Sequence, residues 1–457
     1  MNTKDVLKCV LEEQCCEQYA KHYMREIWDW IDGLNENAVV QLNKISLEEC
    51  YPWYYDKQSG EIRNIDRSFF QIIGVQHYEN DALVSEQPII LQKEIGFLGI
   101  ICCKIQGVWH YLMQGKIEPG NVNVVQISPT VQATKSNFEQ KHGGKVPDYL
   151  DFFLEMKPES ILVDQIQSEQ SSRFWGKRNR NVILMVDREF EEKEHFRWMT
   201  LIQIKELMKH NNIVNMDTRT VISCIPYVLL GQEGDVPFKN KPYFYQTAWN
   251  LNRKAIVEIY KCINDYKMFK NTRKILTPLH ELKSWNFLSN RIVSKGNNPF
   301  EVIFCDIQIE GREVKTWKQP LFAAKGSALF GLFCCDNEGV LQFLVKPRAE
   351  IGCLDMMEIG PSIQIESTEQ ACDEVERLFI KKLNSQEYVV ADILLSEEGG
   401  RFYQEENRNA IIMINKSEIK ENMTGYIWSD FGTLNMLTQV NNCLNIQLRN
   451  LLSLLEI

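Results

Sequence analysis

One polar stretch in the first half of the sequence carries side chains suited to binding a small ligand. Residues 124–144 read VVQISPTVQATKSNFEQKHGG. The segment begins with the alternation of a strand and continues with amides, hydroxyls and a histidine, which a core strand does not need. His142 is a candidate for proton transfer because imidazole titrates near neutral pH. Gly143 and Gly144 would let the backbone approach a ligand closely. A surface loop histidine is an equal alternative.

A second stretch, SSRFWGKRNRN at residues 171–181, concentrates positive charge. Arg173, Lys177, Arg178 and Arg180 all lie in this one stretch, and guanidinium and ammonium groups bind phosphate oxygens. The stretch is therefore a candidate site for a bound phosphate group. Trp175 could stack on a flat ring or pack in the core, and an exposed basic loop is the alternative for the charged residues.

These stretches belong to a chain that contains the same domain twice. GIICCKIQGVWHYLMQGKIEPG at 99–120 matches GLFCCDNEGVLQFLVKPRAEIG at 331–352 without a gap, so that Gly99 corresponds to Gly331. SEQSSRF and NRN, within 168–181, recur as SEEGGRF and NRN within 396–409. Each half then ends with a matching W…NN…R pattern. Such agreement indicates a tandem duplication.

The two copies differ in the residues that could do chemistry. Lys177 and Arg178 become Glu405 and Glu406, and Thr134 becomes Glu366. A phosphate group would be attracted to the first cluster and repelled by the second. We therefore predict that the first half holds the working pocket and that the second is a degenerate or structural copy.

Further candidates follow from the same comparison. Glu169 and His110 could transfer protons, but Glu397 repeats Glu169, and a strand histidine can be satisfied structurally. The remaining predicted binding residues are Gln126, Thr130, Gln132, Thr134, Ser136, Asn137 and Asn181.

The elements that must position these residues form an α+β fold. FFQIIGV, GFLGIICC and VWHYLMQ are typical of strands, and WMTLIQIKELMKHNN has helical spacing. We expect a helical N-terminal extension at residues 1–44 and the first repeat at 45–226. A linker at 227–274 would contain a helix over WNLNRKAIVEIYKCINDY, and the second repeat would follow at 275–457.

Composition narrows the function classes. A net charge of −10 argues against a general nucleic-acid binder. The N-terminus lacks the apolar segment of a signal peptide, and no run suits a membrane span. Fourteen cysteines without a C-x-x-C spacing, several of them adjacent, predict small buried thiols in a reducing cytoplasm rather than disulfides or a metal site.

With these motifs, the chain resembles the NDP-hexose 2,3-dehydratase family. The resemblance rests on REVKTWKQP at 312–320, SPTVQATKSNFEQKHGG, SEQSSRFWGKRNRN and the closing helix, and it covers the chain from about Ile45. It implies two Nudix-like domains, a homodimer, a pocket in each half of which one works, and a nucleotide-linked 4-keto-6-deoxyhexose, usually the thymidine diphosphate form, as substrate. In the first half, Asn80 and Ser85 stand at the positions of Arg312 and Trp317, which predicts an altered nucleotide contact.

Removal of water across carbons 2 and 3 of a 4-keto sugar needs a base, an acid, hydrogen-bond donors for an enolate and cations for the diphosphate. No redox cofactor is required, and the sequence has neither a G-x-G-x-x-G after a strand nor a P-loop. Two alternatives stay open: a nucleotide-sugar-binding protein without activity, and a Nudix-type hydrolase. The hydrolase is disfavoured because REFEEKE at 188–194 lacks the spacing of a magnesium-binding glutamate cluster.

Overall fold

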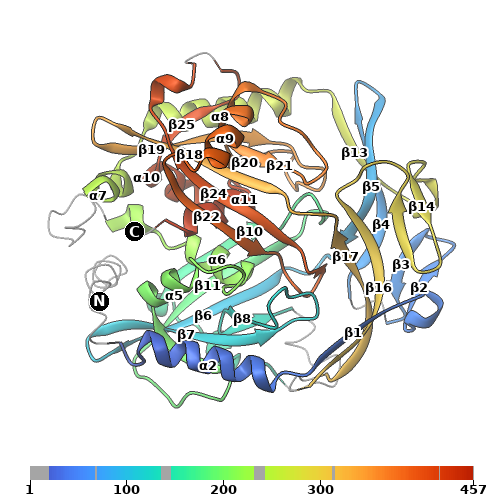
Figure 1. Cartoon of the computed structure of the whole chain (residues 1–457), viewed down its shortest axis with the longest axis horizontal. Coiled ribbons are helices and arrows are strands. Elements are labelled where there is room, and N and C mark those ends of the chain that lie inside the picture. The colour runs from blue at the N-terminus through green and yellow to red at the C-terminus, as the bar shows by residue number, and fades with distance from the viewer. Residues whose placement is uncertain are drawn as a thin grey trace.

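The computed structural model of the chain describes residues 20–66, 69–134, 146–230, 242–310, 314–420 and 423–455. It is an α+β structure whose two halves pack against each other (Figure 1). Helix α2 (Met24–Asn37) lies along the outside of the first half, and α8 (Arg253–Phe269) takes the equivalent place on the second. None of the described helices is long and apolar enough to cross a membrane.

Each half contains a seven-stranded mixed sheet. In the first half, β6 (Gly96–Ile105) pairs antiparallel with β7 (Val108–Ile117) and parallel with β11 (Arg178–Val186). The predicted strands GFLGIICC and VWHYLMQ are confirmed as β6 and β7. The sheet is completed by β8 (Val125–Ser128), β9 (Val131–Ala133), β10 (Ile161–Ser168) and β12 (Phe196–Thr200).

The second half repeats this arrangement around β18 (Leu329–Asn337). The other strands of this sheet are β19 (Val340–Arg348), β20 (Glu358–Pro361), β21 (Ile363–Ile365), β22 (Val389–Ser396), β24 (Glu406–Met413) and β25 (Ile427–Asp430). The duplication read from the sequence is therefore a structural repeat.

Each half also has a smaller, mostly antiparallel sheet, and the two small sheets exchange a strand. β1 (Val40–Ile45) pairs with β16 (Phe300–Ile309) of the second half, whereas β13 (Thr272–Thr277) pairs with β4 (Gln71–Glu79) of the first. The shift that relates Gly99 to Gly331 also relates the start of β1 to the start of β13, so the two are the same strand of the repeat. The other strands are β2 (Trp53–Asp56), β3 (Glu61–Asn64), β5 (Ala82–Leu91), β14 (Trp285–Phe287), β15 (Arg291–Ser294), β17 (Thr316–Ala324) and β23 (Phe402–Tyr403).

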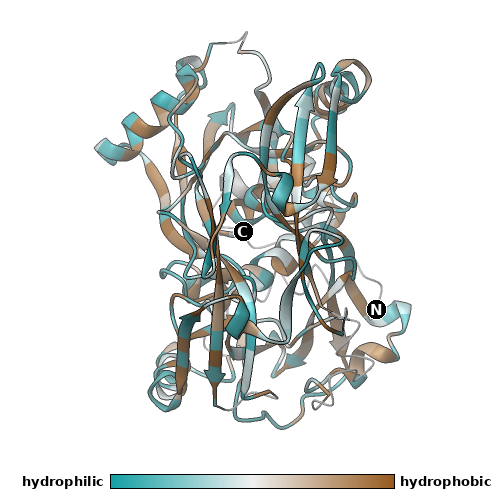
Figure 2. Cartoon of the chain, turned by 90° about the vertical axis from the view of Figure 1, so that its right-hand side faces the viewer, coloured by the Kyte–Doolittle hydropathy of each residue, from teal (hydrophilic) through white to brown (hydrophobic). Residues whose placement is uncertain are grey.

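The buried core crosses the boundary between the halves. Its largest apolar cluster extends from Ile27 to Leu455 and includes residues of α6 (Met216–Ser223) and α11 (Ile446–Ser453), which contact each other. Apolar residues recur along the strands of both halves (Figure 2). Cys102 faces this cluster and Cys103 faces another one, as their adjacent positions on β6 require. The described cysteines are free thiols and most are buried, as predicted.

Two helix predictions need correction. WMTLIQIKELMKHNN begins as strand β12, and α5 (Leu201–Leu207) starts only after Thr200, whose side chain accepts a hydrogen bond from Gln203 N at 3.3 Å. The capping box sets this start, and pairing with β7 fixes Trp198 as strand. The helix predicted through residue 44 ends at Asn37, because the following residues form β1.

The linker region contains α7 (Pro242–Trp249) before α8, and the helix predicted over WNLNRKAIVEIYKCINDY is present from Arg253. Residues 231–241, which include most of the Gly/Pro-rich linker sequence, lie outside the described part of the chain.

Two backbone segments from different halves touch at Gly120. Its N–H donates to Gly399 O at 2.8 Å, and its carbonyl accepts from Gln404 N at 2.7 Å. A Cβ atom at Gly120 would lie 1.6 Å from Phe402 O, closer than any real contact. Only glycine therefore allows this docking. Gly352 makes the reciprocal contact, with its N–H on Ser171 O at 2.8 Å.

We expect Gly120→Ala to lower the free energy of unfolding by about 1–3 kcal/mol or more, because the new methyl group must displace a backbone carbonyl. Urea unfolding followed by circular dichroism measures this. Gly33→Ala in α2 is the matched control, since nothing lies within 4 Å of a Cβ there and alanine favours a helix by up to about 1 kcal/mol. Equal stability of the two variants would contradict the docking argument.

Candidate functional site

A cavity of about 610 Å³ opens in the first half, a size that suits a small organic ligand. Strands β6, β7 and β9 and the start of α6 form its wall. Four predicted binding residues line it: Thr130, Gln132, Thr134 and Lys177. Other polar residues in the wall are Gln92, Gln114, Lys116, Glu118, Asp148, Asn179, His195 and Asp217.

The second half completes this cavity. Glu310 and Lys315, from the connection between β16 and β17, line it together with Glu398 and Arg401 from the loop before β23. The contact at Gly120 brings that loop into place. Gln319 then fixes it, because its Nε2 donates to Gly400 O at 2.8 Å while its Oε1 accepts from Trp317 Nε1 at 3.1 Å.

The Trp-x-Gln-Pro motif of the second half therefore supports the cavity of the first. In the first half, Gln87 makes the reciprocal contact, with its Nε2 donating to Ser172 O at 2.7 Å, and so holds the loop that enters the second half. Asn80 and Ser85, at which the first copy of the motif departs from the pattern, do not line the cavity. The intact copy of the motif thus holds the loop that lines the first-half cavity, and the altered copy holds the loop that enters the second half.

The same exchange separates Arg173 from the predicted pocket. Arg173 is buried, lies 3.2 Å from Glu366 of the second half and stacks over Phe300 at 4.4 Å. Arg401, its counterpart, lines the first-half cavity, stacks over Phe70 at 4.3 Å and donates to Gln92 Oε1 at 3.4 Å. The cation that sequence comparison placed in the first half is thus supplied by the second.

Several other predicted residues form a framework that both halves share. Arg180 Nε donates to Asp164 at 2.7 Å, as Arg408 does to Asp392, and Asn181 Nδ2 donates to a backbone carbonyl at 3.0 Å. Gln126 does not line the cavity, because its Nε2 donates to Ser396 Oγ of the second half at 2.8 Å. Arg178 and Trp175 also lie outside the lining. Contacts repeated in both halves indicate architecture rather than ligand binding.

Glu169 belongs to this framework as well. Its carboxylate accepts a hydrogen bond from Asn179 Nδ2, as Glu397 accepts one from Asn407 at 2.7 Å. Burial, with Glu398 nearby, raises the pKa of Glu169 to about 7. Asn179 lines the cavity and Glu169 does not, so Glu169 lies behind the wall.

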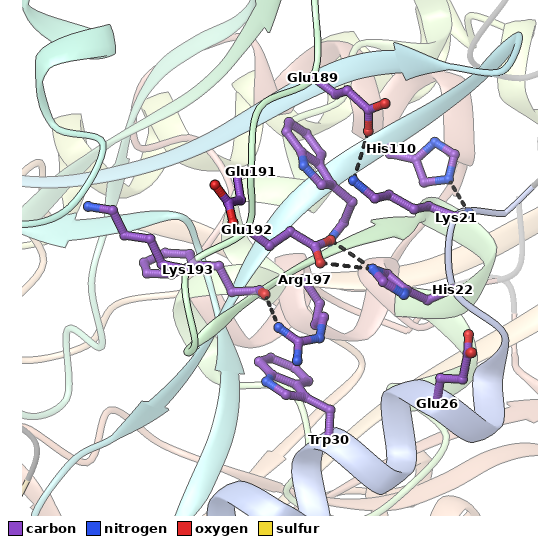
Figure 3. Close-up of polar contacts among 12 residues, drawn as sticks. Lys21, His22, Glu26, Trp30, His110, Glu189, Glu191, Glu192, Lys193 and Arg197 are labelled. Carbon is purple, nitrogen blue, oxygen red and sulfur yellow. Dashed lines mark hydrogen bonds and ion pairs between the residues drawn. The ribbon is translucent and has the colours of Figure 1, made fainter.

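His110 does not line the cavity. Its Nε2 accepts from Lys21 N at 2.9 Å, so Nδ1 carries the proton and donates to Val108 O at 2.9 Å (Figure 3). Burial lowers its pKa. The imidazole is a satisfied strand residue that anchors the segment before α2.

The charged turn at 188–194 holds the same N-terminal segment. Lys21 Nζ lies 2.7 Å from Glu189, and His22 Nε2 lies 2.8 Å from Glu192 (Figure 3). The turn leads to His195, which lines the cavity. Residues 135–145, and with them the predicted site residues Ser136, Asn137, His142, Gly143 and Gly144, lie outside the described residues.

Two acidic groups of the cavity were not among the sequence-based candidates. Asp217, at the start of α6, and Glu398 face the cavity, and neither carboxyl has a hydrogen-bond or ion-pair partner among the described residues. At the equivalent site of the second half the corresponding residues are amides: Gln447 of that half, and Gln170, which the first half supplies. Gln447 donates to Glu350 at 3.5 Å, and Gln170 hydrogen-bonds Glu405. A change from acid to amide between the copies was the signal that could have identified them.

Burial determines the electrostatics of these groups. It raises the pKa of Asp217 well above its ordinary value, and the neighbouring Glu398 adds to the effect. Burial also raises the pKa of Glu398, while Arg401 opposes the shift. The pKa of Lys177 is lowered by burial, and its Nζ donates to Glu94 O at 2.8 Å. Both carboxyls of the cavity thus have raised pKa values, and a neighbouring arginine opposes the shift of Glu398.

In the equivalent region of the second half, the corresponding side chains bond to one another and to a side chain of the first half. Glu366 pairs with Arg173, and Gln364 Nε2 donates to Glu350 at 2.9 Å. One carboxylate oxygen each of Glu350 and Glu358 and the Sγ atom of Cys353 all lie within 4.8 Å of one another. Burial raises the pKa of Glu350 to about 7 and that of Glu358 to about 8.

We expect Glu358→Gln to stabilise the protein at alkaline pH. The pKa of Glu358 is higher in the folded state than in the unfolded state. The contribution of this carboxyl to the free energy of unfolding is therefore fully present below pH 4.5 and is lost as the pH rises through 8. Within that window the free energy of unfolding falls by about 1.4 kcal/mol for each pH unit. Glutamine already occupies the equivalent position, Gln126.

Urea midpoints of wild type and variant between pH 5 and pH 9 measure this effect. The difference should be small at pH 5 and grow in favour of the variant towards pH 9. Parallel curves would show that Glu358 titrates normally.

Comparison with known proteins agrees with the repeat and covers most of the chain. The family model described as NDP-hexose 2,3-dehydratase matches residues 24–225 and again 256–455. Each match begins at or within the helix, α2 or α8, that precedes an exchanged strand, so the matched unit includes that helix and strand.

Three similar proteins carry the name dTDP-4-dehydro-6-deoxy-alpha-D-glucopyranose 2,3-dehydratase. The protein from Saccharopolyspora spinosa is 36% identical over 93% of this chain and 90% of its own length. The one from Streptomyces violaceoruber is 33% identical over 90% and 92%. The one from Amycolatopsis orientalis is 30% identical over 93% and 88%.

Proposed function

The chain belongs to the NDP-hexose 2,3-dehydratase family, and we propose that it removes water from dTDP-4-dehydro-6-deoxy-α-D-glucose in the cavity of its first half. It is therefore a hydro-lyase. The observation that carries the assignment to this cavity is a pair of carboxyl groups, Asp217 and Glu398, which line it beside cationic side chains and have no hydrogen-bond or ion-pair partner among the described residues.

The cavity offers the cations that a nucleotide diphosphate requires. Lys116, Lys177, Lys315 and Arg401 line it. Lys177 has Glu405 as its counterpart, and the position equivalent to Lys315 is Leu83, so two of these four cations have no cationic counterpart in the other copy. We propose that these groups hold the diphosphate and that Gln132, Thr134 and Asn179 contact the sugar.

Thr130 supports the wall instead of binding sugar. Its hydroxyl donates to Leu112 O at 2.5 Å and accepts from Ile101 N at 3.0 Å. Ser362 does the same in the second half. The segment with Ser136, Asn137, His142, Gly143 and Gly144 connects Thr134 to Val146, both of which line the cavity, and we retain it as a proposed part of the site.

The reaction follows from the position of the ketone. The 4-keto group acidifies the hydrogen on carbon 3, so a base can remove it and leave an enolate. The hydroxyl on carbon 2 leaves as water once an acid protonates it, which forms the double bond between carbons 2 and 3. The resulting enol takes up a proton at carbon 2 and becomes the 3,4-diketo-2,6-dideoxy sugar.

Finer features of the family resemblance are also proposals. We propose that residues 45–226 and 275–457 form two Nudix-like domains, each preceded by the helix and exchanged strand described above. We further propose a cytoplasmic homodimer, for which the exposed apolar residues Met268 and Phe269 at the end of α8 offer a contact.

Incubation with dTDP-4-keto-6-deoxyglucose in deuterated water, followed by mass spectrometry, tests the function. We expect a product lighter by one water, or its maltol-like breakdown product, with deuterium at carbon 2. Intact sugar that nevertheless raises the melting temperature would favour a binding protein, and released sugar phosphate would favour a hydrolase.

The two equivalent arginines distinguish the two halves. Arg401→Gln should weaken substrate binding at least tenfold, because the guanidinium lies in the cavity wall and charged hydrogen bonds contribute about 1.5–3 kcal/mol. Arg173→Gln is the matched variant, and it should lower stability by unpairing Glu366 while affinity stays within about twofold of wild type. Calorimetric titration at one temperature, with melting temperatures for both variants, makes the comparison; loss of affinity in the Arg173 variant alone would place the substrate in the second half.

A further inference from the structure

We infer that Asp217 and Glu398, one from each half, are the acid and the base of the dehydration. The inference rests on the proposed function and assigns residues to its two proton transfers. Both carboxyls face the cavity, and both lack a protein partner among the described residues. An enzyme that must move two protons on one sugar ring needs two such groups on its wall.

The comparison of the halves shows that the two acids are not part of the shared framework. Glu118 is retained as Glu350, and each accepts a hydrogen bond from the equivalent glutamine, Gln132 at 3.2 Å and Gln364 at 2.9 Å. Asp217 and Glu398 instead have the amides Gln447 and Gln170 as counterparts. An amide can replace a carboxylic acid as a hydrogen-bonding group of similar shape, but it cannot transfer a proton at neutral pH. The second half has therefore kept the shape and lost the chemistry.

The charges around each carboxyl indicate which role it takes. Asp217 is almost wholly buried and lies near Glu398, Glu169 and Glu118, which keep its proton in place, so it is the group that can donate to the leaving hydroxyl on carbon 2. Burial, with Glu118 nearby, raises the pKa of Glu398 as well, but Arg401, Lys177 and Lys116 oppose that shift. Of the two carboxyls, Glu398 is therefore the one that can accept the proton from carbon 3.

The step balances with these two groups. The Glu398 carboxylate takes the carbon-3 proton, and the electron pair of that C–H bond forms the enolate of the 4-ketone. The pair then returns to form the carbon 2–carbon 3 double bond as the carbon 2–oxygen bond breaks and the oxygen takes the proton of Asp217. Glu398 ends protonated and Asp217 ionised, and exchange with water restores both groups.

The chain supplies a matched control for the base. Glu397 is next to Glu398 in the chain and is buried, and burial raises the pKa of Glu397 to about 7. Its carboxylate, however, accepts from Asn407 Nδ2 at 2.7 Å and does not line the cavity. A raised pKa without access to the substrate should confer no role in the reaction.

The test measures two rates in deuterated water for each variant: formation of the dehydrated product, and exchange of the carbon-3 hydrogen of the recovered substrate. Glu398→Gln should lower product formation by about 10²-fold or more and abolish the exchange. Asp217→Asn should lower product formation similarly but keep the exchange, because the enolate still forms. Glu397→Gln should stay within about threefold of wild type, and affinity for dTDP should be unchanged in all three variants.

Glu398→Asp is a second variant in case the glutamine variant does not fold. It keeps a carboxyl with a shorter reach, so exchange should continue at a reduced rate. Product formation near the wild-type rate in Glu398→Gln would overturn the assignment of the base, and loss of exchange in Asp217→Asn would overturn that of the acid. Failure of the wild-type enzyme to dehydrate the sugar would instead refute the proposed function.

Discussion

The docking of two backbone segments at Gly120 is the contact on which the site depends. The loop that carries Glu398 and Arg401 reaches the first-half cavity only because its Gly399–Phe402 backbone can lie directly against a residue without a side chain. Gln319 and Trp317 then hold the loop through a chain of side-chain hydrogen bonds. A buried hydrogen-bonded chain of this kind fixes geometry more than it adds stability, and geometry is what proton transfer requires.

The exchange between halves explains why both copies of the duplicated domain are needed. β1 and β13 each complete the other half's sheet, and Arg219 and Arg449 reach across to the carbonyls of Ser396 and Ser168. Both arginines are fully buried, so their removal would leave carbonyl groups unsatisfied in the core. The second half is therefore a structural partner and a donor of site residues, whatever its own pocket binds.

Once each half depended on the other, the two pockets were free to diverge by charge alone. The scaffold contacts are nearly identical, as the Glu–Asn and Arg–Asp pairs of both halves show. What differs is a small set of side chains: Lys177 against Glu405, Thr134 against Glu366, and two acids against two amides. In the second half, Glu366 forms an ion pair with Arg173, and Glu405 is a buried carboxyl group.

Much of this architecture was already determined by the sequence. The constant shift between the two copies located the repeat, and the apolar pattern of the strand segments located β6 and β7. The lack of a C-x-x-C spacing predicted buried free thiols. Each of these predictions depends only on residues close in the chain or on one fixed shift. The polarity of Gln132, Thr134 and Lys177 likewise predicted part of the cavity wall.

The tertiary structure alone decided which half supplies each group. Comparing the halves position by position treats each as self-contained, so Arg173 was assigned to the first-half pocket although Arg401 occupies it. It also made Glu169 resemble a catalytic group, although its contacts are those of Glu397. The physical reason is that strand and loop exchange depends on contacts between residues from opposite halves of the chain, and no local periodicity or spacing encodes which of two equivalent partners a segment will meet.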